Sequence, residues 1–140
     1  MSHRRGVLDT STVILLPRLK DADQLPEEPV ITAVTLAELS VGPLVAATEA
    51  ERAARQMHLQ QTEADFDPLP FDSAAARAFG PVAASLRSSG GKHAARVLDA
   101  MIAATAMAQG LPVYTCNPSD FEGIDGLEVV AVHHPDETPA

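Results

Sequence analysis

Short apolar runs typical of strands alternate with longer helical segments along this chain. The strands are predicted at residues 6–8, 30–32, 68–71, 111–115 and 127–132. The helices are predicted at 12–19, 33–46, 48–64, 73–87 and 97–109, with a single turn at 117–121. Helices between strands indicate a parallel sheet covered on both faces, because each helix returns the chain to the start of the next strand. We therefore expect an α/β fold whose parallel sheet has helices on both faces.

Several helix ends carry local signals. Asp9 and Thr32 precede helical segments and can accept a hydrogen bond from the first turn. Thr48 and Glu51 have the spacing of a capping box, and Gly110 stands where a left-handed residue would end a helix. The length of 140 residues suits one domain. We expect a single domain over residues 1–140, with an ordered core over about 6–132 and a frayed tail at 133–140.

Composition narrows the class of protein. The net charge of −9 argues against broad nucleic-acid binding through a basic surface, although bound metal ions can reverse the sign of charge locally. The single cysteine, Cys116, rules out a disulfide within the chain and suits a reducing compartment. The N-terminus lacks the apolar segment of a signal peptide, and no stretch is long and apolar enough to span a bilayer. We expect a soluble cytoplasmic protein that does not bind membranes.

Four acidic residues far apart in the sequence are predicted to meet at one edge of the sheet. Asp9 directly follows the first strand, and Asp120 follows the strand at 111–115. Glu38 and Asp99 lie on helices that start at the carboxyl edge, with Asp99 expected in the first turn of its helix. In parallel α/β sheets this edge is where ligands bind.

The electrostatic repulsion between carboxylates packed this closely must be offset. Two unit charges about 4 Å apart repel each other by roughly 4 kcal/mol at an effective dielectric constant near 20. Either one carboxyl keeps its proton or a cation is bound. Oxygen ligands suit Mg²⁺ or Mn²⁺, which can activate water and stabilise charge on a phosphodiester. Each acid alone also has a structural interpretation: Asp9 as a helix cap, Asp99 as a helix-dipole partner, Asp120 as a turn residue and Glu38 as the edge of an apolar stripe.

The four acids lie in four short segments of the chain: residues 7–11 (VLDTS), 35–39 (TLAEL), 98–106 (LDAMIAATA) and 115–121 (TCNPSDF). Together these segments resemble the motifs of PIN-domain ribonucleases, most closely those of VapC-type toxins from bacterial toxin–antitoxin pairs. Their order and spacing agree with the family from residue 7 to about residue 132. The resemblance implies a three-layer α/β/α fold with a parallel sheet of four or five strands.

The resemblance implies an endoribonuclease that depends on Mg²⁺ or Mn²⁺. Asp9 and Asp99 would be the main metal ligands, Glu38 would bind directly or through water, and Asp120 would complete the site and help to orient the attacking water. Thr10, Ser11 and Asn117 would hold the carboxylates and the nearby loop. The family also implies homodimers, and a VapB-type antitoxin that lays a C-terminal segment over the site. Residue 116, which is often basic in these toxins, is Cys116 here.

Other interpretations remain open from the sequence. Lys92 and Arg96, in and after a glycine-containing loop, are candidate RNA contacts, although a solvated loop explains them as well. The chain could also be a catalytically weak binding partner with a PIN fold. A receiver-like signalling domain is a third alternative, but it would need an acidic pair after the first strand and a lysine after the last, and both are missing here.

Overall fold

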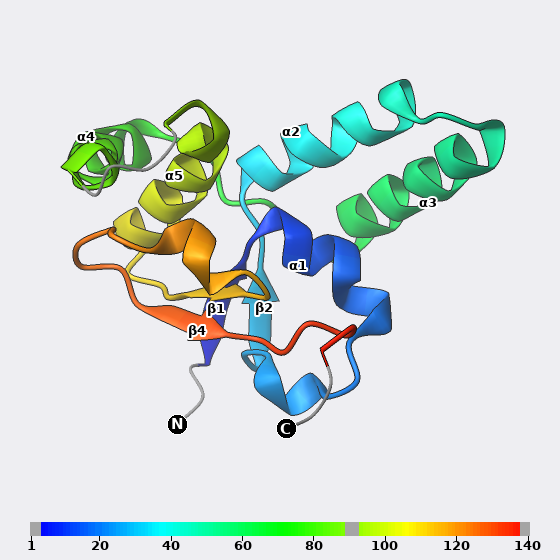
Figure 1. Ribbon diagram of the computed structural model, residues 1–140, viewed down its shortest axis with the longest axis horizontal. Helices are drawn as coiled ribbons and strands as arrows, with labels where there is room; N and C mark the ends of the chain where they lie inside the picture. Colours follow the sequence, from blue (N-terminus) through cyan, green and yellow to red (C-terminus); the bar gives the residue numbers. More distant parts are fainter. Residues whose placement is uncertain (1–3, 89–92, 138–140) are drawn as a thin grey trace.

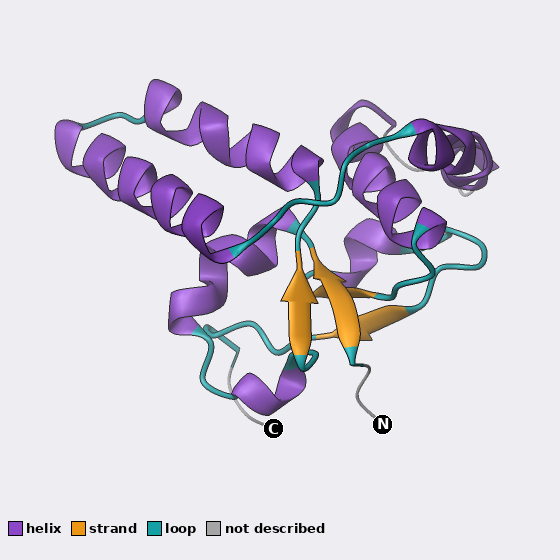
Figure 2. Cartoon of the chain, turned by 180° about the vertical axis from the view of Figure 1, so that it is seen from behind, coloured by secondary structure: helices purple, strands orange, loops and turns teal. Residues whose placement is uncertain are grey.

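The computed structural model describes residues 4–88 and 93–137 (Figure 1). Its sheet has four strands in the order β2-β1-β3-β4, and every neighbouring pair is parallel. The strands are β1 (Arg5–Leu8), β2 (Glu28–Val30), β3 (Val113–Thr115) and β4 (Val129–Ala131). The predicted parallel α/β sheet is therefore confirmed, and its carboxyl ends lie at one edge (Figure 2).

Helices cover both faces of this sheet (Figures 1 and 2). Val7 and Val113 point to the face packed by α4 and α5, whereas Leu8 and Tyr114, the next residues, point to the face packed by α1 and α3. This alternation along each strand produces the two apolar layers. The α-helices are α1 (Thr10–Leu15), α2 (Ala33–Val41), α3 (Glu49–Asp65), α4 (Ser73–Ser88) and α5 (His93–Ala108). Single 3₁₀ turns are η1 (Leu16–Arg18), η2 (Ala22–Gln24), η3 (Gly42–Val45) and η4 (Pro118–Phe121).

Prolines account for most differences from the predicted elements. The first two predicted helices end early, at Leu15 and Val41, and continue as the 3₁₀ turns that contain Pro17 and Pro43. The predicted strand at 68–71 is wrong. Its middle residue, Leu69, forms one bridge to Thr32, with hydrogen bonds to Ile31 and Ala33. The flanking residues at 68 and 70 are prolines, which have no N–H to donate to a ladder.

The helix that carries Asp99 begins earlier than predicted. It starts at His93 instead of residue 97, so Asp99 lies in the second turn and not in the first. Alanine and arginine before residue 97 favour the extra turn. The C-terminal end agrees with the prediction, because Gly110 has a φ of 68° and donates to Met107 O, while Leu111 donates to Ala106 O. This pair of bonds is the Schellman arrangement.

Residues 133–137, which we expected to fray, contact the rest of the chain. His133 N donates to Gln24, and Arg18 pairs with Asp136. Both charged side chains are more than half exposed, so the ion pair contributes little stability. Within residues 4–88 and 93–137, no helix is long and apolar enough to cross a membrane.

Candidate active site

Asp9 stands where β1 ends and α1 begins, and its side chain is held from several directions. The carboxylate is buried, with 2% of the residue exposed. Thr12 donates its N–H (3.3 Å) and its hydroxyl to Oδ1. Ser11 Oγ (3.1 Å) and Thr115 Oγ1 (2.8 Å) donate to Oδ2. Burial raises the pKa of Asp9, and these hydrogen bonds, Thr12 first, act in the opposite direction.

Two of these donors, Thr12 and Thr115, were missed by the sequence analysis. Each hydroxyl also accepts a backbone N–H: Thr12 Oγ1 from Cys116 (3.0 Å) and Thr115 Oγ1 from Asn117 (2.9 Å). The two threonines therefore join the end of β3 to the start of α1, directly beneath the carboxylate. The only sequence signal for them is a threonine three residues after a capping aspartate and another at the end of a buried strand.

The predicted supporting residues lie beside the acids that they were expected to support. Ser11 donates to Asp9, and Asn117 Nδ2 donates to Ser11 Oγ at 3.0 Å. Thr10 Oγ1 donates to Glu38 Oε1 at 2.7 Å and lies 2.9 Å from Thr35 Oγ1. These contacts connect α1 to α2 at the carboxyl edge and fix the orientation of the Glu38 carboxylate.

Asp99 lies among the other three acids. It is half-buried on α5, and its pKa is raised to about 7. Burial is the largest cause, followed by the negative charges of Asp120, Asp9 and Glu38, while the positive charge of Arg96 lowers the pKa. The structure thus brings the four predicted acids into one electrostatic site at the carboxyl edge of the sheet.

The two candidate RNA contacts are placed differently. Lys92 lies outside the described residues, so its contact with RNA stays a prediction. Arg96 is in the first turn of α5, and its guanidinium binds backbone carbonyls in the segment that carries Asp120.

The donors of the site suit a hard divalent cation, although they do not converge on one point. Within the described parts of the chain, no group of three or more His, Cys, Asp or Glu side chains is arranged to hold a metal ion. All four acids nevertheless offer carboxylate oxygen, and their mutual repulsion at Asp99 is the kind that a cation relieves. The residues present therefore fit Mg²⁺ or Mn²⁺, with Asp9 already oriented by its hydrogen bonds.

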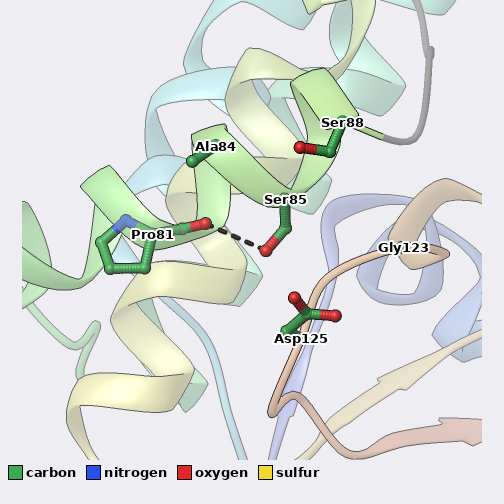
Figure 3. Close-up of a pocket in the computed structure, with 6 residues that line it drawn as sticks. All are labelled: Pro81, Ala84, Ser85, Ser88, Gly123 and Asp125. Carbon is green, nitrogen blue, oxygen red and sulfur yellow. Dashed lines mark hydrogen bonds between the residues drawn. The ribbon is translucent and has the colours of Figure 1, made fainter.

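Two surface hollows are lined by segments next to η4. Figure 3 shows one between α4 and the loop after η4, lined by Pro81, Ala84, Ser85, Ser88, Gly123 and Asp125. Its Ser85 hydroxyl donates to Pro81 O in the same helix, at 3.0 Å. Another hollow includes Cys116, Asn117 and Pro118 and therefore adjoins the Asp9 network.

Comparisons with known proteins agree with this fold and place the chain in a family. The PIN domain family matches residues 7–127. Ribonuclease VapC5 of Mycobacterium tuberculosis is 40% identical over 129 residues, which cover 91% of this chain and 93% of that protein. Ribonuclease VapC of Rickettsia bellii is 30% identical over 132 residues, covering 90% and 95%.

A solved structure shares the fold as well. The crystal structure of VapBC-5 from Mycobacterium tuberculosis, a member of the VapBC family of toxin–antitoxin systems, has a chain with a TM-score of 0.80 and 40% identity. The match covers 92% of this chain and 99% of that one. The chain therefore belongs to the PIN-domain family, among its VapC-type ribonuclease toxins. This membership leaves the receiver-like alternative without support.

Proposed function

We propose that this chain is the toxin of a type II toxin–antitoxin pair and that it cleaves RNA internally with the help of Mg²⁺ or Mn²⁺. The observation that carries the proposal is the environment of Asp99, where three other carboxylates act on one half-buried acid at the carboxyl edge. Relatives at 40% and 30% identity bear the name ribonuclease, which supports the same activity.

Asp9 and Asp99 would be the main ligands of the ion, with Glu38 and Asp120 completing the set. When bound, such an ion lowers the pKa of water and stabilises the charge that develops on a phosphodiester. The protein's contribution is orientation. Thr12, Thr115 and Ser11 hold the Asp9 carboxylate, and Thr10 holds that of Glu38. Asp120 would orient the attacking water and can accept its proton.

Substitution of the two main acids tests the activity. Asp9→Asn and Asp99→Asn should each reduce RNA cleavage by more than the roughly 10- to 100-fold typical of losing an outer partner of a metal ligand. Chelation of divalent ions should abolish cleavage in the wild type. Asp125→Asn, in an exposed loop, is the matched control and should cleave like the wild type. Full activity in either main variant, or with chelator present, contradicts the proposal.

A thermal shift separates this proposal from the catalytically weak binding partner. An ion that binds only the folded state stabilises it by about 2.7 kcal/mol at a concentration 100 times the Kd. Mg²⁺ should therefore raise the Tm of the wild type but not of Asp99→Asn, with NaCl at equal ionic strength as the control. A thermal shift without RNA hydrolysis would favour the binding partner.

We also propose that the chain binds a VapB-type antitoxin and forms homodimers. The similar VapBC-5 structure is described as a toxin–antitoxin family member. Large apolar side chains are exposed on η3 and α3, including Leu44 (86%), Val45 (66%) and Met57 (71%). Exposed apolar groups of this size are typical of protein interfaces.

A further inference from the structure

The guanidinium of Arg96 donates hydrogen bonds to the backbone of the segment that carries Asp120, an arrangement that we call the backbone clamp. Its Nε and Nη2 donate to the carbonyl of Asp120 at 3.2 and 2.7 Å, and Nη2 also donates to the carbonyl of Glu122 at 2.9 Å. Arg96 is half-buried and stands three residues before Asp99 on α5, a spacing that places both side chains on one face of the helix. A planar guanidinium offers several donors at fixed angles, which a lysine cannot reproduce.

The segment needs such a partner because η4 is only one turn long. Asp120 N and Glu122 N bond to the carbonyls of Asn117 (3.0 Å) and Ser119 (3.3 Å). The carbonyls of Asp120 and Glu122 come at the end of the turn, where no further turn supplies N–H groups to them. Between them, Phe121 is 2% exposed and packs in the apolar core. The core thus holds the segment from inside, and Arg96 holds it from the side of α5.

We propose that Arg96 is a positioning residue of the candidate active site, which fixes the backbone at Asp120 and so holds this acid beside α5, the helix that carries Asp99. Of the three other acids, Asp120 acts most strongly on Asp99. Arg96 therefore connects two acids from separate elements through one side chain. It also brings a positive charge to a site of four negative ones, which reduces their repulsion. The effect on catalysis rests on the proposed function, whereas the hydrogen bonds from Arg96 to the backbone do not.

This role and an RNA contact lead to different results for two substitutions. A phosphate contact depends mainly on charge, so Arg96→Lys would keep it and Arg96→Gln would lose it, with weaker RNA binding. A backbone clamp depends on the fork of donors, so both Arg96→Lys and Arg96→Gln should disturb the segment. Arg77→Gln, an exposed arginine on α4, removes the same charge elsewhere and is the matched control.

Hydrogen exchange tests the clamp without metal or RNA. The backbone amides of residues 117 and 119–122 should exchange roughly tenfold faster or more in both Arg96 variants, as expected when hydrogen bonds from a charged group are lost. Amides of β1 should be unchanged in all variants, which shows that the fold is intact. Unchanged exchange at 117–122 in Arg96→Gln would overturn the inference, even if the protein cleaves RNA as proposed.

A double-mutant cycle then tests the catalytic consequence. Arg96→Gln should lower kcat by about 10- to 100-fold, with KM for RNA changed by less than about twofold. In the Asp120→Asn background, Arg96→Gln should have little further effect, because the two residues act through one group. Multiplying effects, a raised KM, or wild-type activity in Arg96→Lys would overturn the positioning role. An inactive wild type would instead refute the proposed function and leave the exchange result to decide on the clamp.

Discussion

At the scale of single residues, Asp99 is the group whose ionisation the fold opposes most clearly. Its pKa is raised from 3.8 to about 7 in the folded protein, by burial and by three neighbouring acids. Between these pH values the folded state holds a proton that the unfolded state has lost, so the free energy of unfolding falls as pH rises. Above about pH 7 the full penalty remains.

This penalty predicts that Asp99→Asn stabilises the metal-free protein at high pH. At pH 8 the variant should exceed the wild type by on the order of 1 to 2 kcal/mol, after allowance for solvent screening at this half-exposed site. At pH 4 the two proteins should be nearly equal, since the carboxyl then carries its proton. Urea denaturation with chelator present measures the difference. A gap that is the same at both pH values would contradict the assigned cause.

Thr115 is the second residue whose substitution should have a specific effect. Its hydroxyl donates to the buried Asp9 and accepts from Asn117 N. Thr115→Val keeps the shape but leaves both groups without this partner, at a cost of about 1–3 kcal/mol, and should also reduce RNA cleavage. Thr62→Val is the control, because Thr62 is likewise buried but its hydroxyl donates to His58 O within its own helix. Equal losses of cleavage in both variants would argue against the role of Thr115.

At the scale of elements, β1 and β3 approach closely because β1 contains a glycine. A Cβ built on Gly6 would lie 2.6 Å from two ring carbons of Tyr114, whose residue is 1% exposed. Gly6→Ala should therefore cost about 1–3 kcal/mol, the usual range for overpacking a core. Gly80→Ala is a control that should change the free energy of unfolding in the opposite direction. A Cβ on residue 80 would meet nothing within 4 Å, and the residue lies inside α4, where alanine favours the helix by about 1 kcal/mol over glycine. Denaturation midpoints that move in the same direction would contradict this account.

At the scale of the whole molecule, the exposed apolar side chains and the acidic net charge lead us to expect binding to partner proteins. The net charge is −9, and Ile14 (52%) and Val41 (51%) add to the exposed apolar residues of η3 and α3. Light scattering on purified chain should give a mass near twice 14.7 kDa. An equimolar VapB-type antitoxin should suppress RNA cleavage. A monomer at every concentration would refute the homodimer, and undiminished cleavage would refute the antitoxin.

The sequence by itself determined the local features and the order of the elements. Asp9 as a helix cap, Gly110 as a helix end and the alternation of strands and helices depend on residues close together in the chain. Because parallel strands end at one edge, chain order alone predicts that the four acids lie at one rim of the sheet. The prolines at 68 and 70 argue against a fifth strand. The apolar run at 68–71 alone could not show that Leu69 would be its one residue to bridge to Thr32.

The long-range contacts that hold those acids were decided only by the tertiary structure. Thr115 reaches Asp9 across 106 positions, and Arg96 reaches the Asp120 carbonyl across 24. Threonine and arginine make such bonds only where the packed sheet and helices bring a donor within about 3 Å of an acceptor. No pattern of spacing encodes that distance, since it depends on the register of β1 against β3 and on the packing of α5 beside η4.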